Sequence, residues 1–409
     1  MYTQYPNMEL VSYYCKGGYH PVDLDDVFHD RYRVVSKLGH GMYATVWLVE
    51  DMDLQRLASL KVLAAEVSSM SSEVDVLRHL RRHQEQNPPD AGAEHVVKVF
   101  DDFEVVGPNG THRCIVTELL GPSLGVDLEA MYDDTPVPFH VTKRMVPQIT
   151  RGVAYLHRCG IVHGDLHVGN VLLYHPKFEH LSVQDYQNYF ENSEGTAPSH
   201  WDKSPLAETE LAHLPKKLHS APHFLPLLEL CLASTDSIHV KICDFGEAFL
   251  YPTDDKSVPN AIQLNTARPY CAPEIIFREP APGPPTDIWA LAVLLHMVLS
   301  GNCEVFPMRR NQDKILLREM VLALGKLPDR WWTLWKERAE YFDEDGKFIG
   351  DRSDLFPSTG KLLKEWGLSG DDRTVLEILM RGMLRYEMED RITADTVVKL
   401  IPASWLSGS

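Results

Sequence analysis

Residues 163–170, His-Gly-Asp-Leu-His-Val-Gly-Asn, constrain this chain more than any other segment. Asp165 can accept a proton from a hydroxyl group, and Asn170 can offer an oxygen to Mg²⁺ five residues later. The apolar run at 171–174 is typical of a short strand, which would anchor the loop and aim both side chains at one point. This spacing predicts phosphoryl-transfer chemistry.

The composition fits a large globular protein. A chain of 409 residues that is 44% hydrophobic can bury a sizeable core, and we expect two lobes with insertions. The net charge of −18 argues against direct nucleic-acid binding, because phosphate contacts need an excess of Lys and Arg. The same charge favours a basic protein partner.

Cysteine usage and hydropathy bear on the compartment. The seven cysteines are scattered without metal-ligand spacing, which indicates free thiols in a reducing compartment, cytoplasmic or nuclear. The N-terminus lacks a signal-peptide pattern. The longest apolar run, 288–299, is shorter than the roughly 20 residues that a membrane span needs, so we predict a buried helix and no membrane association.

Residues 32–63 have the alternation of a hairpin sheet. Gly39 and Gly41 lie in a turn of this sheet, where backbone amides can approach phosphate oxygens without a Cβ in the way. Lys61 follows on a strand, and Glu73 interrupts the apolar stripe of the next helix. A Lys that holds phosphates needs a carboxylate to fix its ammonium group. Taken singly, these residues also fit an ordinary turn, an edge-strand cation and a surface charge.

Further elements follow along the chain. Two more strands are predicted at 96–103 and 114–119, and a helix at 143–158. Residues 175–237 are rich in His, Pro, Ser and Glu and have poor periodicity, so we predict an insertion that is at least partly disordered. A strand at 238–243 then delivers Asp244.

Several short motifs occur in a diagnostic order. After the loop come Asp244-Phe245-Gly246, Ala272-Pro273-Glu274, Asp287-Ile288-Trp289 and finally Arg391. Each motif is common by chance, but the whole series resembles the C-lobe of the protein kinases. The resemblance implies a bilobal α+β fold with a small antiparallel-sheet N-lobe and a mainly helical C-lobe.

The resemblance also implies a division of the chain. We expect an N-terminal extension at 1–30, the N-lobe at 31–120, and the C-lobe at 121–409 with an insertion at about 175–237.

The chain is most similar to the SR-protein kinases, as a divergent fungal-type member. The resemblance covers roughly 13–174 and 238–405, and it is carried by Tyr-Cys-Lys-Gly-Gly-Tyr-His-Pro-Val at 14–22, Asn-Gly-Thr-His at 109–112 and Gly-Lys-Leu-Pro at 325–328. It implies a monomeric serine/threonine kinase that uses ATP and Mg²⁺. The implied substrates are basic, Arg-Ser-rich proteins, many of them splicing factors.

The resemblance assigns roles to single residues. Asp165, Lys61 and His167 would be catalytic, and Glu274 with Arg391 would form a buried structural ion pair. Asn170 and Asp244 would hold Mg²⁺, and the backbone of Glu118 and Leu120 would hold adenine beside Thr117. The full nucleotide-binding set would be Leu38, Gly39, Gly41, Val46, Lys61, Glu73, Glu118, Leu120, Asn170 and Asp244.

Two positions in the loop depart from the kinase pattern. Gly164 replaces the Arg that many kinases use to bind an activation-loop phosphate, and the SR-protein kinases also lack this Arg. We therefore predict constitutive activity without a phosphate on Thr253, Ser257 or Thr266. His167 replaces the usual Lys. It either contacts the γ-phosphate, as a donor or a cation, or only fills space.

Substrate choice is open at this stage. Ile315 and Leu322 stand where the SR-protein kinases place acids that bind Arg-rich peptides, although Asp313 and Glu319 are near in sequence. A further acidic cluster consists of Glu340, Asp343, Glu344 and Asp345. The loop also resembles that of small-molecule phosphotransferases such as aminoglycoside and choline kinases. A pseudokinase scaffold is a further alternative, which the retained set of charged residues disfavours.

Overall fold

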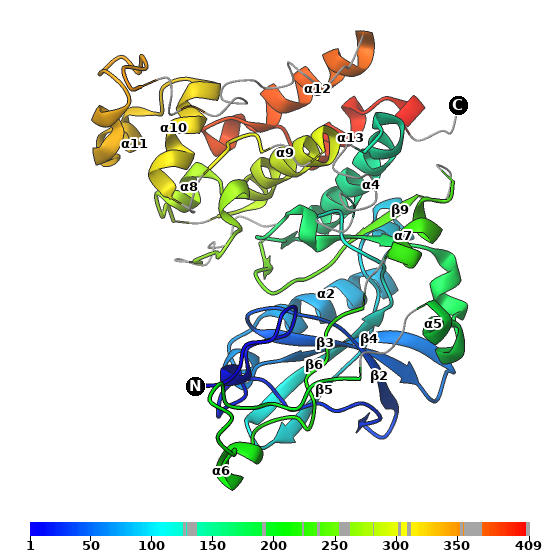
Figure 1. Cartoon of the computed structure of the whole chain (residues 1–409). Helices are drawn as coiled ribbons and strands as arrows, with labels where there is room; N and C mark the ends of the chain where they lie inside the picture. The colour runs from blue at the N-terminus through cyan, green and yellow to red at the C-terminus, as the bar shows by residue number, and fades with distance from the viewer. Residues whose placement is uncertain are drawn as a thin grey trace. The chain divides into compact units, whose positions relative to one another are not determined.

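The computed structural model describes most of the chain. Contacts between Cα atoms divide it into two compact units (Figure 1). The first comprises Met1–Arg81, Val97–Pro122 and Tyr174–Ala233, and the second Arg82–Val96, Ser123–Leu173 and Ser234–Ser409. The described residues are 1–125, 128, 137–189, 194–222, 225–234, 238–252, 262–280, 282–301, 304–308, 312–351, 355 and 370–405.

A six-stranded antiparallel sheet in the order β1-β2-β3-β4-β6-β5 forms the framework of the first unit. One face of the sheet is a core that includes Trp47, Val49, Leu60 and Val116, all at most 1% exposed. Alternating β-branched residues favour this arrangement. The strands are β1 Val27–Phe28, β2 Tyr32–His40, β3 Ala44–Asp51, β4 Arg56–Leu63, β5 Val99–Gly107 and β6 Gly110–Glu118.

Helices surround this sheet. The helix α1 spans Ala65–Ser68, and α2 spans Glu73–Gln86 and buries an apolar stripe that includes Val76 and Leu80. Three more helices come from the insertion. They are α5 Val183–Tyr189, α6 Glu208–Leu211 and α7 Leu225–Leu232.

The predicted disorder of the insertion is wrong for its described residues. Leu214 and Leu218 are buried in a cluster with Val11, Tyr14 and Tyr19 of the N-terminal extension. The backbone adds contacts, since the Thr3 amide donates to Ser199 O and the Trp201 amide to Met1 O. The described part of the insertion is ordered because apolar residues such as Leu214 and Leu218 are buried by a segment some 200 positions earlier, which a local periodicity cannot show.

The division of the chain also differs from the expected ranges. Both the extension and the insertion belong to the first unit, although we placed the insertion in the C-lobe, and residues 82–96 belong to the second unit.

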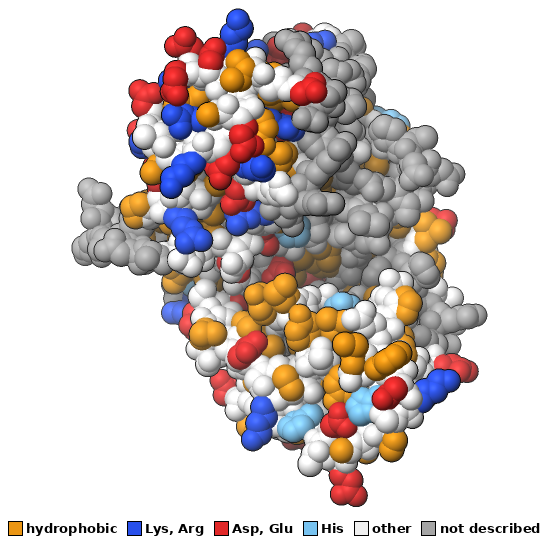
Figure 2. All heavy atoms as spheres, turned by 60° about the vertical axis from the view of Figure 1, so that its left-hand side comes forward, with side chains coloured by type: hydrophobic (Ala, Val, Ile, Leu, Met, Phe, Trp, Pro, Cys, Tyr) orange, Lys and Arg blue, Asp and Glu red, His pale blue; other side chains and the backbone are white. Residues whose placement is uncertain are grey.

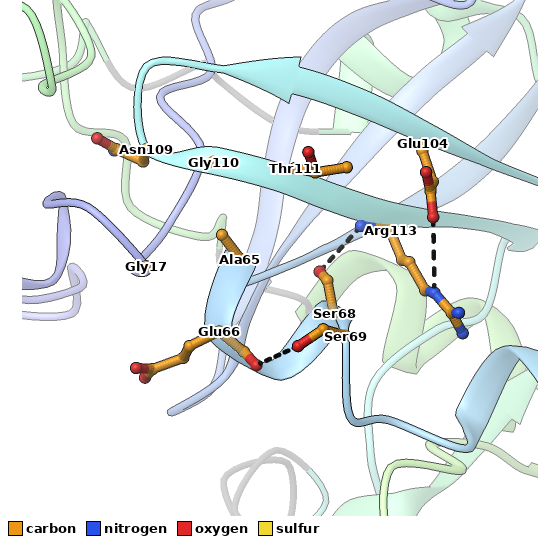
Figure 3. A pocket seen from close by; sticks show the side chains of 10 residues that line it. All are labelled: Gly17, Ala65, Glu66, Ser68, Ser69, Glu104, Asn109, Gly110, Thr111 and Arg113. Atoms are coloured by element: carbon orange, nitrogen blue, oxygen red, sulfur yellow. Dashed lines mark hydrogen bonds and ion pairs between the residues drawn. The ribbon is translucent and has the colours of Figure 1, made fainter.

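A cavity of about 400 Å³ lies where the extension meets the sheet (Figure 3). The turn at Gly17 forms one wall, and its amide donates to Asn109 O at 2.8 Å in the β5–β6 turn. The short helix α1 forms another wall, with Glu66 and Ser69 at the rim and the Arg113 side chain beside Glu104. These contacts fix the extension to the sheet.

The second unit is mainly helical (Figure 1). Its central helix, α9, is buried from Thr286 to Ser300, so the prediction of a buried helix at 288–299 is confirmed. None of the helices in the described ranges is both long and apolar enough to cross a membrane. The α-helices are α4 Phe139–Arg158, α8 Pro273–Ile276, α9 Pro284–Ser300, α10 Asp313–Leu324, α11 Asp329–Leu334, α12 Gly370–Met383 and α13 Ala394–Leu400.

Short strands complete the second unit. The strand β7 Ile161–Val162 pairs with β10 Phe249–Leu250, and β8 Val171–Tyr174 pairs with β9 His239–Ile242. These two pairs flank the loop at 163–170 and bring the residues after β9 next to it.

The predicted ion pair between Glu274 and Arg391 is confirmed. Two parallel hydrogen bonds of 2.7 Å join the guanidinium group to both carboxylate oxygens, and both side chains are at most 2% exposed. Carbonyls of Pro285, Arg385 and Tyr386 accept the remaining Arg391 protons, and the Thr286 hydroxyl donates to Glu274. The opposite charges of Glu274 and Arg391 thus compensate each other. The same bonds hold α8, α9 and the segment before α13 together.

We expect Glu274→Ala to lower the free energy of unfolding by about 3–5 kcal/mol, because it leaves the Arg391 charge buried without a partner. Urea denaturation measures this loss. The control is Glu340→Ala, which removes an exposed ion pair with Lys314 (3.5 Å) and should cost less than about 1 kcal/mol. Equal losses in the two variants would contradict the structural role.

Candidate active site

The first unit presents a lysine that is fixed by a carboxylate. Lys61 Nζ on β4 donates to both oxygens of Glu73 on α2, at 2.7 and 2.9 Å. The Glu73 side chain is 3% exposed and that of Lys61 is 21% exposed, so the pair is shielded while the ammonium remains accessible. The register pairs Lys61 with Val46, which puts both side chains on one face of the sheet. The ion pair that the sequence predicted is therefore present.

The glycine turn joins β2 to β3. Its hairpin is closed by the Gly41 amide, which donates to Ala44 O at 2.9 Å. A Cβ built on Gly39 or Gly41 would meet no described heavy atom within 4 Å, and neither residue has a positive φ. The described fold itself therefore does not require glycine at these positions. Close approach of another group to the backbone is a remaining reason for it.

The end of β6 carries the residues expected to bind adenine. The Glu118 carboxylate is buried and accepts the Lys98 amide at 2.7 Å, and the Glu118 amide donates to Lys98 O. The Thr117 hydroxyl makes a long bond of 3.3 Å to Glu118 O. Because a carbonyl oxygen has two lone pairs, Glu118 O can accept another donor. Leu120 follows and is 9% exposed.

In the second unit, one buried carboxylate shapes the loop at 163–170. Asp287 on α9 accepts the amides of His163 and Gly164 at 2.8 and 2.9 Å, and it pairs with the ring of His157 on α4 at 2.9 Å. Gly164 has φ +78, and the Thr266 hydroxyl donates to its carbonyl at 2.6 Å. The sequence motif around Asp287 was recognised, but its role in holding the loop was not.

Asp165, Asn170 and Asp244 are brought together by the β8–β9 pair. Asn170 Nδ2 donates to Asp165 O at 3.0 Å, which orients its other amide atom, Oδ1, away from that bond. The Cys243 amide donates to Asn170 O at 2.9 Å, so the residue before Asp244 is fixed to the same loop. Asp244 has φ +61, a conformation that is uncommon outside glycine and that occurs at functional sites.

These donors fit a magnesium ion. Mg²⁺ prefers hard oxygen ligands and commonly takes only one or two from the protein. The Asn170 amide oxygen and the Asp244 carboxylate are of that kind. Within the described ranges, no group of three or more His, Cys, Asp or Glu residues could hold a metal. Asn170 and Asp244 are the pair that the sequence indicated.

The geometry of His167 restricts its protonation. Its Nδ1 accepts the Gly169 amide at 3.0 Å, so in the neutral ring the proton is assigned to Nε2. Nε2 lies 3.4 Å from Asp165 Oδ2. Asp165 Oδ1 accepts the Ala267 amide at 2.8 Å, which fixes the carboxylate. Sequence analysis did not foresee this contact, because it joins residues 102 positions apart.

Comparison with known proteins agrees with the fold. The family description "protein kinase domain" matches residues 32–189 and 230–401. The chain is 30% identical over 393 residues to a serine/threonine-protein kinase SRPK of Physarum polycephalum, covering 93% of this chain and 88% of that protein. It is 28% identical over 415 residues to a serine/threonine protein kinase of Aspergillus fumigatus, covering 97% and 90% of the two chains.

A shorter match has a higher sequence identity. The human SRSF protein kinase 3 is 41% identical over 162 residues, which are 39% of this chain and 28% of that protein.

The chain belongs to the protein kinase family and is a serine/threonine kinase. Within the family, its relatives place it among the SRPK-like members, as its sequence motifs predicted.

The local backbone favours glycine at position 164. A Cβ on this residue would lie 2.6 Å from Glu247 O, in addition to the cost of its left-handed φ. We expect Gly164→Ala to lower the melting temperature more than Gly370→Ala, because Gly370 also has a positive φ (+62) but a Cβ there meets no described atom within 4 Å.

Differential scanning calorimetry compares the two variants. The left-handed conformation alone should cost each about 1–2 kcal/mol. A melting temperature of Gly164→Ala equal to that of Gly370→Ala would contradict a steric contribution at the loop.

Proposed function

We propose that this kinase transfers the γ-phosphate of ATP to serine in basic proteins and that it does so constitutively. The observation that carries the proposal is the closed ion pair between Lys61 and Glu73, which forms without any modified residue. In protein kinases this pair must be in place before phosphates can be held productively. A pseudokinase scaffold would not need it.

Phosphoryl transfer asks for positioning more than for covalent chemistry. Asp165 would accept the seryl proton on Oδ2, because Oδ1 is occupied by the Ala267 amide. At 3.4 Å the contact of Oδ2 with His167 is long, which leaves a lone pair for that proton. Lys61 would hold α- and β-phosphate oxygens, with the backbone at Gly39 and Gly41 over them.

A magnesium ion bound by Asn170 and Asp244 would neutralise phosphate charge. The bond from Asn170 Nδ2 to Asp165 O makes the orientation of this ligand depend on the catalytic loop itself. The carbonyl of Asp165 thereby links the proposed magnesium ligand Asn170 to the proposed proton acceptor Asp165.

Constitutive activity is supported by how the substrate loop is attached. The Thr266 hydroxyl bonds to Gly164 O, and the Asn265 amide and side chain donate to Glu247 at 2.9 and 3.1 Å. These bonds between unmodified groups would hold the substrate loop in place, as an Arg–phosphate pair does in many kinases. Thr266 is buried, which disfavours its phosphorylation. Thr253 and Ser257 lie outside the described residues.

Arg-Ser specificity depends on acids that can bind arginine. Asp313 pairs with Arg268 (3.4 Å), Glu340 with Lys314 (3.5 Å), and Glu344 with Arg338 (3.3 Å). Figure 2 shows basic and acidic side chains intermingled on the visible face of the second unit, in the upper part of the view. Since these acids already have cationic partners, we propose a general preference for basic proteins, with Arg-Ser-rich proteins as one class among them.

Substrate assays separate the alternatives. With ATP and Mg²⁺, we expect phosphorylation of an Arg-Ser peptide and of a generic basic protein with rates within about tenfold of each other. An aminoglycoside should not be phosphorylated. Asp165→Ala should abolish transfer to both proteins, and phosphoproteomics with wild type against this variant would identify physiological products. Turnover of the aminoglycoside alone would overturn the proposal.

Substitutions of His167 test the role of a hydrogen-bond donor in the loop. At saturating ATP, His167→Ala should slow phosphorylation roughly ten- to hundredfold, because one donor to developing phosphate charge is lost. His167→Gln and His167→Lys each place a donor near the Nε2 position and should retain most of the rate. Equal rates in all three variants and wild type would mean that His167 only fills space.

Phosphatase treatment tests constitutive activity. We expect protein treated with a broad phosphatase, and shown by mass spectrometry to carry no phosphate, to keep its rate within about twofold, since hydrogen bonds between unmodified groups hold the substrate loop. Reactivation of a silent enzyme by a second kinase would contradict this.

A further inference from the structure

The N-terminal extension buries a charged pair that phosphoryl transfer does not use. Glu9 Oε1 accepts Lys37 Nζ at 2.6 Å, and both side chains are 1% exposed. The Tyr14 hydroxyl donates to the same carboxylate oxygen at 2.5 Å, and the Lys37 ammonium lies 4.1 Å from the centre of the Trp47 ring. Burial by itself raises the pKa of Glu9, but Lys37 and Tyr14 outweigh it and lower that pKa.

This pair fixes the extension at one place in the first unit. Breaking a buried pair leaves an uncompensated charge, so detachment of the segment around Glu9 is strongly disfavoured. Lys37 belongs to β2 and stands two residues before Gly39, and Trp47 belongs to β3. The extension is therefore anchored to β2, one of the two strands that carry the glycine turn, and the same Lys37 side chain contacts Trp47 of the other strand.

Tyr19 reaches the turn from this anchored segment. Its hydroxyl donates to Gly41 O at 2.5 Å and contacts Met42 O at 3.1 Å. The ring is 2% exposed and packs edge-on against Tyr13 and Tyr14, with ring centres 5.5 Å apart in each case. Burial raises the pKa of Tyr19 to about 12, so the hydroxyl keeps its proton.

These two contacts determine where two amides point. In a planar trans peptide the C=O and N–H groups point in opposite directions. When the carbonyls of Gly41 and Met42 face Tyr19, the N–H groups of Met42 and Tyr43 face away from it. The Gly41 amide is already used by Ala44 O. The amides of Met42 and Tyr43 are thus the ones that Tyr19 orients.

We propose that Tyr19 is a positioning residue for the glycine turn, holding the amides of Met42 and Tyr43 in the orientation that receives the phosphates of ATP. The inference rests on the proposed function, because it assigns those phosphates to this turn. It makes the N-terminal extension part of the nucleotide-binding apparatus.

Tyr19→Phe removes the hydroxyl and keeps the buried ring. One hydrogen bond contributes a net 0.5–1.5 kcal/mol, which corresponds to an expected rise of about two- to twelvefold in KM for ATP. KM for the protein substrate should change by less than about twofold. Tyr13→Phe is the matched control, since that neighbouring ring is 41% exposed and removal of its hydroxyl should leave both constants unchanged.

Amide hydrogen exchange in the absence of nucleotide gives a second, independent readout. Exchange of the Gly41 amide, which is bonded to Ala44 O, should accelerate in Tyr19→Phe and stay unchanged in Tyr13→Phe. This measurement does not depend on activity. Absence of ATP-dependent activity in wild type would therefore overturn the proposed function, while the exchange result would still judge the role of Tyr19 in holding the turn.

Two outcomes would overturn the inference itself. One is an unchanged KM for ATP together with unchanged exchange at Gly41. The other is a parallel change of kcat, both KM values and the melting temperature, which would assign Tyr19 a purely structural role.

Discussion

The conformation of the catalytic loop depends on one buried carboxylate. Asp287 accepts two successive backbone amides, those of His163 and Gly164, and also binds the ring of His157. Backbone amides that are buried need partners, and an ionised acceptor provides stronger bonds than a neutral one. Because Asp287 lies on α9, which is buried along most of its length, these hydrogen bonds attach the loop to the core helix of the second unit.

The first unit shows how segments far apart in sequence can act on one turn. The extension contributes Tyr19 and the Glu9 carboxylate, and the insertion contributes Leu214 and Leu218 to the cluster that buries Tyr19. The Met42 side chain of the glycine turn is exposed. Figure 2 shows apolar side chains gathered on the visible face of the first unit. The glycine turn is therefore supported by a shell of tertiary contacts beyond its own hairpin.

Much of the architecture was predictable, for reasons that differ between elements. The ion pairs of Lys61 with Glu73 and of Glu274 with Arg391 were predicted because the family resemblance assigns both partners to known motif positions. The insertion was misjudged because its order comes from burial against the extension. Gly164 was noticed as a missing Arg, whereas its left-handed backbone and its contact with Glu247 O were invisible in the sequence.

The sequence by itself determined the family, the order of the motifs and the chemistry that their residue types permit, because those depend on residue identity and spacing. Tertiary structure decided which atoms are already engaged. It showed that Asp165 Oδ1 is bound to Ala267 and that His167 Nδ1 is bound to Gly169. It also paired the acids near Arg268 with cations and brought Tyr19 to the glycine turn. Such long-range contacts follow from packing and hydrogen-bond satisfaction across the fold, which spacing along the chain does not encode.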